Sequence, residues 1–110
     1  MLDFHIGTGG INKVGKHIGG LEMDELEWLQ INGYIKKTET GHYNGNPECI
    51  PYFDDVILSH EQVLNVYNTF NNKLIDNNKK GELKYQAINK FKDILESAIN
   101  LKQGLSTIAD

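Results

Sequence analysis

Two long segments in the second half of the chain carry apolar residues at helical spacing, and no other feature constrains the fold as strongly. The first segment has one apolar stripe, formed by Val63, Val66, Tyr67, Phe70 and Leu74. The second has a stripe formed by Tyr85, Ile88, Phe91, Leu95, Ala98 and either Leu101 or Lys102, widened by Ile94 and Ile99. This spacing is typical of amphipathic helices. It predicts helices over residues 60–75 and 82–103, packed as an antiparallel pair because the link between them is short.

The residues that flank these segments support the same boundaries. Ser59 and Gln62 have the spacing of a capping box, in which each side chain accepts a hydrogen bond from the other residue's backbone N–H. Residues 76–81 are polar and predict the turn between the two helices. Gly104 follows the second stripe and predicts the end of that helix.

The first half of the chain is less regular, because it holds nine of the eleven glycines and both prolines. Leu2–Ile6 predicts a strand that ends in a glycine-rich turn at residues 7–10. Small helices are predicted over residues 11–18 and from Asp24 to the Asn32-Gly33 pair. Further short strands are predicted over residues 34–38, 49–52 and Val56–Leu58.

Together these elements predict an α+β fold: short N-terminal strands and small helices, followed by two long antiparallel amphipathic helices. A length of 110 residues fits a single domain, spanning residues 1–110. Cys49 is the only cysteine, so no disulfide can form within the chain. No stretch approaches the roughly 20 apolar residues that a membrane span needs, and none resembles a signal peptide. We therefore expect no membrane association and a cytoplasmic location.

Charge is unevenly distributed along the sequence, which has a formal net charge of −4 at pH 7. Residues 1–71 hold ten acidic residues against four lysines, whereas residues 72–110 hold seven lysines against five acidic residues. An acidic surface repels phosphate backbones and attracts basic partners. Arginine, the side chain that best clamps phosphates and guanine edges, is absent. We therefore expect a basic protein partner and no nucleic acid.

The glycine-rich turn does not complete a nucleotide-binding motif. A dinucleotide fingerprint needs a third small residue where Asn12 stands, within a βαβ unit. A phosphate-binding loop needs Ser or Thr after its lysine, but His17 follows Lys16. The run predicts a flexible turn, and no cofactor is expected.

Other reactive side chains do not form a recognisable centre. The four histidines lack the spacing of helical metal ligands, so we expect no metal. Acidic neighbours such as Glu48 disfavour a Cys49 thiolate, which favours a buried structural cysteine. Asp54 and Asp55 are adjacent and would point to opposite sides of a strand, so they should not act together as an acid–base pair. We expect a chain that is not an enzyme.

Acidic residues remain as candidates for binding a partner. Those near Trp28 wrap one side of the predicted small helix and could form either a docking surface or a solvated helix face. The candidate partner-binding residues are Glu22, Asp24, Glu25, Glu27, Tyr43, Glu48, Asp54 and Asp55. Aromatic residues can anchor such a surface, although Trp28 fits core packing better than an interface.

Residues 50–63, with the sequence IPYFDDVILSHEQV, combine a short acidic and aromatic stretch with a Ser-capped helix. This arrangement resembles part of small bacterial immunity proteins, the antitoxins of contact-dependent inhibition and related polymorphic toxin systems. The resemblance implies a cytoplasmic protein that binds one cognate toxin domain and blocks its active site. Many such toxins are nucleases with basic clefts, which an acidic surface would complement.

A different class of protein is suggested by residues 26–37. This segment resembles the end of a winged-helix recognition helix followed by its wing, which implies a DNA-binding regulator. Two helices should then precede it, and the recognition helix would be acidic and lack arginine. The inhibitor and the DNA-binding regulator therefore both remain open from the sequence, and a small enzyme with dispersed catalytic residues is a third possibility.

Overall fold

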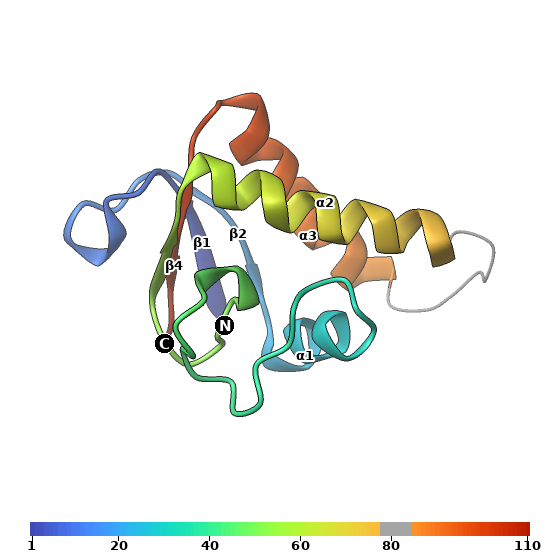
Figure 1. Cartoon of the computed structure of the whole chain (residues 1–110). Helices are drawn as coiled ribbons and strands as arrows, with labels where there is room; N and C mark the ends of the chain where they lie inside the picture. Colours follow the sequence, from blue (N-terminus) through green and yellow to red (C-terminus); the bar gives the residue numbers. More distant parts are fainter. Residues whose placement is uncertain (78–84) are drawn as a thin grey trace.

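The computed structural model describes residues 1–77 and 85–110 of the chain, which form a four-stranded sheet and three α-helices (Figure 1). The strands are β1 (Leu2–Ile6), β2 (His17–Leu21), β3 (Val56–Leu58) and β4 (Leu105–Ile108). The α-helices are α1 (Met23–Ile31), α2 (His60–Asn77) and α3 (Tyr85–Asn100), and two short 3-10 helices are η1 (Gly10–Asn12) and η2 (Pro47–Cys49). The α+β class is therefore confirmed.

The sheet is antiparallel and has the strand order β2-β1-β4-β3. The last strand along the sequence, β4, thus lies between β1 and β3. The sequence did not predict β4, because Ser106 and Thr107 lie in its centre and interrupt any apolar alternation. Both side chains are buried, so this strand is recognisable only from its tertiary contacts.

The hydrophobic core lies between one face of the sheet and the helices that cover it (Figure 1). Phe91 of α3 is its centre: its ring contacts Phe4 of β1 at a centroid distance of 6.3 Å and Phe70 of α2 at 5.5 Å. Burial of large aromatic side chains contributes strongly to stability. At the far edge of the core, Gly19 of β2 packs against Ile94, where a larger residue would collide.

The start of α2 is confirmed. The Ser59 backbone N–H donates to Gln62 Oε1 at 2.9 Å, and the Gln62 N–H donates to Ser59 Oγ at 3.1 Å, which completes the predicted capping box. Val63 and Phe70 of the predicted stripe are fully buried. The helix extends through the first two residues of the predicted turn, and residues 78–84, with the rest of that turn, lie outside the described part of the chain.

The prediction for the second long helix is only partly matched. Its stripe is buried at Phe91, Leu95 and Ala98, whereas the side chain of Tyr85 lies outside the description. The helices α2 and α3 contact each other but cross rather than align, and they do not end the fold, because β4 follows them (Figure 1).

The end of α3 comes three residues before the predicted end. Lys102, with φ 55°, adopts the left-handed conformation that commonly terminates helices, and the Gln103 N–H donates to the Ala98 carbonyl at 3.0 Å. Gly104 was predicted to stop the helix, but it serves another purpose. A Cβ at Gly104 would collide with the Leu58 carbonyl, so glycine permits the close approach of β4 to β3.

Three predicted elements in the first half are wrong. Residues 11–18 form no α-helix; η1 is followed by an extended segment in which Gly15 packs against the Ile6 carbonyl, and β2 then begins. Residues 34–38 form no strand, since Tyr34 and Ile35 are both buried and do not alternate. Residues 49–52 form no strand either, because Ile50 has φ 49° directly after η2. The predicted strands Leu2–Ile6 and Val56–Leu58 are confirmed.

The first and last residues lie close together, because the N-terminal amino group donates to Asp110 Oδ2 at 2.6 Å (Figure 1). This contact raises the pKa of the amino group to about 11, with the hydrogen bond to Asp110 as the main cause. Among the described helices, none is long and apolar enough to cross a membrane.

Candidate partner-binding groove

Of the four acidic residues predicted to form an exposed surface on the first helix, Glu25 is the one that is buried. Glu22 caps the helix and accepts from the Glu25 backbone N–H, while the Glu22 N–H donates to Glu25 Oε1 at 3.0 Å. Glu25 is only 8% exposed, and its carboxylate accepts two hydrogen bonds from Lys90 Nζ, at 2.9 and 3.1 Å. The prediction that Glu25 faces a partner is therefore wrong: it ties α1 to α3. Asp24 and Glu27 are exposed.

Trp28 is half-buried and stacks on Tyr34, with the ring centroids 5.6 Å apart. It packs against the hydrophobic core, as the sequence favoured.

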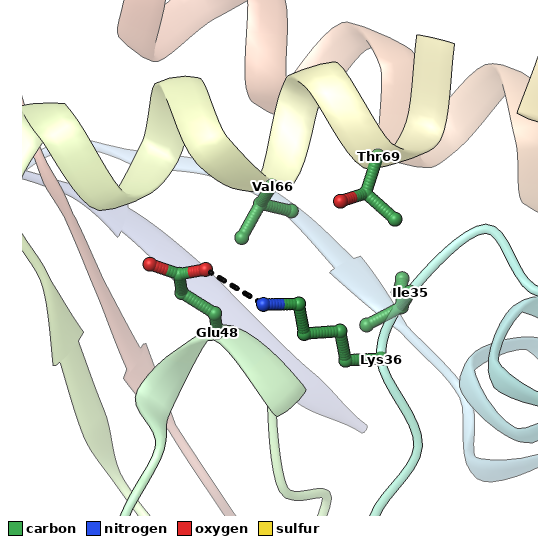
Figure 2. A pocket seen from close by; sticks show the side chains of 5 residues that line it. All are labelled: Ile35, Lys36, Glu48, Val66 and Thr69. Atoms are coloured by element: carbon green, nitrogen blue, oxygen red, sulfur yellow. Dashed lines mark ion pairs between the residues drawn. The ribbon is translucent and has the colours of Figure 1, made fainter. Parts of the chain in front are cut away.

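Glu48 also has a structural role. Its carboxylate lies 3.6 Å from Lys36 Nζ and accepts from Asn65 Nδ2 at 3.1 Å, so it connects η2 to the segment after α1 and to α2. Figure 2 shows Glu48 and Lys36 facing each other beside Val66 and Thr69 of α2. The depression between these side chains leaves no space for a water-sized ligand. This place is therefore a packed contact and not a binding site.

The neighbouring carboxylates Asp54 and Asp55 point to different partners, as predicted. Asp54 Oδ2 accepts from the Tyr43 backbone N–H at 2.6 Å and lies 3.2 Å from His42 Nδ1. Asp55 Oδ1 accepts from the Ala109 N–H at 2.7 Å. The Tyr43 hydrogen bond lowers the pKa of Asp54, with a smaller contribution from His42 and an opposing one from burial. Asp54 therefore stays ionised at neutral pH and holds residues 42 and 43 near the start of β3.

A groove of about 460 Å³ lies beside β3, between η1 and the segment that holds Tyr43 and Pro47. Its lining includes three large apolar or aromatic residues that are substantially exposed: Ile11 at 62%, Tyr43 at 52% and Ile57 at 47%. Asp55 adds a carboxylate to the lining. Concave sites lined by apolar residues and a few placed polar groups are the usual form of a binding site.

Hydrogen bonds from the centre of the sheet hold the η1 wall in place. The Gly10 N–H donates to Ser106 Oγ at 3.0 Å, and Ser106 Oγ donates to the Gly7 carbonyl at 2.7 Å. Gly10 has φ 64°, a conformation that glycine adopts without strain, and it packs next to Ile57. The glycine-rich run that failed as a nucleotide-binding motif thus forms one wall of the groove.

The other side of the groove depends on β3 and on η2. The buried Thr107 Oγ1 accepts from the Val56 N–H at 3.0 Å, which fixes the start of β3 against β4. Asn46 Oδ1 accepts from the Glu48 N–H at 3.0 Å and caps η2 next to Pro47. The groove therefore has walls that are fixed by specific contacts.

The structure brings together only some of the predicted binding residues. Tyr43 and Asp55 line the groove, and Asp54 positions Tyr43. The α1 residues Glu22, Asp24, Glu25 and Glu27 do not line it, nor does Glu48. Sequence reasoning missed Ile11 and Ile57, although Ile57 stands between two buried residues of a strand and so had to face outward.

Histidines and the cysteine form no second site in the described part of the chain. His17 Nε2 lies 2.9 Å from Asp3 Oδ1, and the rings of His5 and His17 are 5.1 Å apart. No group of three His, Cys, Asp or Glu residues among those described could hold a metal ion. Cys49 is a free, buried thiol, as the sequence predicted.

The arrangement expected of a winged helix is not formed. All of residues 1–37 are described, and α1 is the only α-helix among them. No strand follows α1 where a wing should begin.

Comparisons with known proteins give no family and no fold relative. No family model matches the sequence, no curated protein is significantly similar to it, and no solved structure matches the fold.

Proposed function

We propose that the chain is an immunity-type inhibitor, which binds a cognate protein toxin domain in the cytoplasm and blocks its active site. The resemblance of residues 50–63 to immunity proteins supports this class. The part of the structure that supports it best is the groove beside β3, where exposed apolar residues and a carboxylate meet.

The groove has the composition of a protein-binding site. Tyr43, Ile11 and Ile57 leave apolar surface exposed to water, and covering it would favour association. Isolated exposed apolar residues are common, but three on the walls of one concave site are more informative. A protein partner could cover this surface without any reaction taking place on the chain.

Charge favours a basic partner at this place. Asp55 lines the groove, and the ionised Asp54 carboxylate accepts a hydrogen bond from the Tyr43 backbone N–H. A toxin that acts on nucleic acid needs a basic cleft, and its lysine and arginine residues complement such a surface. The mechanism is occlusion: the inhibitor fills the cleft and neutralises the side chains that would hold the substrate.

The test is to identify a toxin gene beside the gene for this chain and to coexpress its C-terminal domain with the chain. We expect growth to be restored and the purified toxin domain to bind the chain in calorimetry. Asp55→Lys should weaken binding about tenfold or more, because it places a like charge in the cleft. Glu27→Lys is the matched control, since Glu27 is exposed on α1 and does not line the groove, and it should have little effect.

Two results would contradict the proposal. One is the absence of any toxin gene at the locus together with binding of random-sequence DNA in low salt, which would favour the regulator instead. The other is a toxin domain that kills equally well with and without the chain.

A further inference from the structure

We infer that the groove beside β3 is a socket for one arginine side chain of the protein partner, an inference that rests on the proposed inhibitor function. The groove offers three features that an arginine uses together: apolar walls, a fixed carboxylate and an aromatic residue.

The apolar walls suit the aliphatic part of an arginine. Ile11 and Ile57 come from different elements, η1 and β3, and both are substantially exposed at the groove. Arginine buries its methylene chain along apolar surface while its charged end stays at a polar group. A volume of about 460 Å³ admits a whole side chain of this kind.

The carboxylate of Asp55 supplies the charged contact. Its Oδ1 accepts from the Ala109 N–H at 2.7 Å, so its orientation is fixed before a partner arrives. An ionised carboxylate has about four acceptor positions and can receive a guanidinium through two parallel hydrogen bonds. Because the acceptor is already oriented, little conformational entropy is lost on binding.

Tyr43 supplies an aromatic surface. Its backbone N–H is bound to Asp54 at 2.6 Å, which holds the residue at the wall of the groove. The planar guanidinium stacks on aromatic rings better than the compact ammonium of lysine does. The presence of an aromatic residue and a carboxylate in one groove therefore favours arginine over lysine.

The occupant is another protein and not a second copy of this chain. The chain contains no arginine, and all eleven of its basic residues are lysines. Self-association through the groove would therefore lack the side chain that fits it best.

The socket can be tested without any toxin. The ¹⁵N-labelled full chain is titrated with N-acetyl-arginine amide and, separately, with the lysine and norleucine analogues, while amide shifts are followed. We expect saturable shifts at Ile11, Tyr43 and Ile57 with arginine, and an apparent Kd at least about threefold higher with lysine. Absence of saturable shifts with arginine, or equal shifts with norleucine or lysine, would overturn the inference.

Two variants assign the contacts. Asp55→Asn keeps an oxygen to accept from Ala109 but removes the charge, and it should weaken arginine binding about tenfold. Tyr43→Leu keeps an apolar side chain but removes the ring, and it should reduce the difference between arginine and lysine. Glu27→Gln, on α1, should leave both affinities unchanged. Unaltered arginine binding in Asp55→Asn would also overturn the inference.

The results separate the two proposals. If arginine binds in the groove but the chain does not protect cells from the toxin, the socket is supported and the inhibitor function is contradicted. If the chain protects cells from the toxin but does not bind arginine, the inhibitor function is supported and the socket is contradicted.

Discussion

The helical layer, formed by α2 and α3, and the irregular segment of residues 32–55 are held in place by different kinds of interaction. In the helical layer, apolar side chains such as Phe70 and Phe91 pack against each other and are fully buried. In the irregular segment, backbone groups are fixed one at a time by polar side chains: Thr38 accepts from the Gly41 N–H, and Asn46 accepts from the Glu48 N–H. The irregular segment, which is held by these single hydrogen bonds, forms one wall of the groove.

This difference separates the region that stabilises the fold from the region that forms a wall of the groove. Apolar packing is cooperative and tolerates little local change, whereas a loop held by a few hydrogen bonds can be altered without loss of the fold. The helical layer thus supports the sheet, and the irregular segment places Tyr43 at the groove. Substitutions in the two regions should therefore differ in their effect on stability.

The largest effect is expected from Phe91→Ala in the centre of the helical layer. Phe91 contacts rings from both β1 and α2, so its removal leaves a cavity that the neighbours cannot fill. We expect a loss of about 3–5 kcal/mol in the free energy of unfolding, measured by urea denaturation. Leu101→Ala, just beyond α3 at an exposed residue, is the control and should change stability by less than about 0.5 kcal/mol. Similar losses for both variants would contradict the central place of Phe91.

A smaller effect is expected from Lys90→Met, which removes the cation that pairs with the buried Glu25 carboxylate. We expect a loss of about 1–3 kcal/mol in the free energy of unfolding, because, of its described hydrogen bonds, the buried carboxylate then keeps only the one from the Glu22 N–H. The double variant with Glu25→Gln removes the charge as well and should recover part of that loss. If the single and double variants were equally destabilised, the ion pair would not be what joins α1 to α3.

Thr107→Val tests the boundary between the two regions, where β3 begins. The variant keeps the shape of the buried side chain but leaves the Val56 N–H without its acceptor. We expect a loss of about 1–2 kcal/mol and faster hydrogen exchange at Val56. Thr8→Val, at an exposed residue, should change stability by less than about 0.5 kcal/mol. Unchanged exchange at Val56 would show that the hydroxyl does not fix this strand.

The smallest effect is expected from acid, and it should be confined to the irregular segment. The pKa of Asp54 is lowered in the folded chain. The ionised Asp54 therefore stabilises the fold at pH values above its usual pKa of 3.8, and this stabilisation is lost as the pH falls through the lower pKa of the folded chain. NMR titration should show the Tyr43 amide shifting in that range while core resonances of α2 and α3 stay unchanged. A simultaneous change in the core would mean that the two regions are not separate.

The sequence predicted most where apolar residues repeat. The α2 stripe and the Ser59 capping box were correct because helical periodicity and local capping both act within a few residues. The strand Val56–Leu58 was also correct. By contrast, β2 was missed, and its first two residues were placed in a predicted helix, because Gly19 and Gly20 carry no side chains to show a pattern.

The candidate site was less predictable than the fold. Acidic residues on α1 were selected from their spacing, but whether a carboxylate is free depends on distant residues, as Lys90 shows for Glu25. The groove is formed by elements separated by more than thirty residues, η1 and the region of Tyr43 to Ile57. Asp55 and Tyr43 were identified from their chemistry, whereas the apolar walls required the arrangement of the sheet.

The position of β4 has a consequence for biosynthesis. This strand is the last part of the sheet to be made, yet it lies between β1 and β3 and fixes η1 through Ser106. While the ribosome still holds Leu105–Ile108, β3 has no neighbour to pair with and the groove lacks one of its supports. The groove beside β3 is therefore complete only after translation has passed this strand.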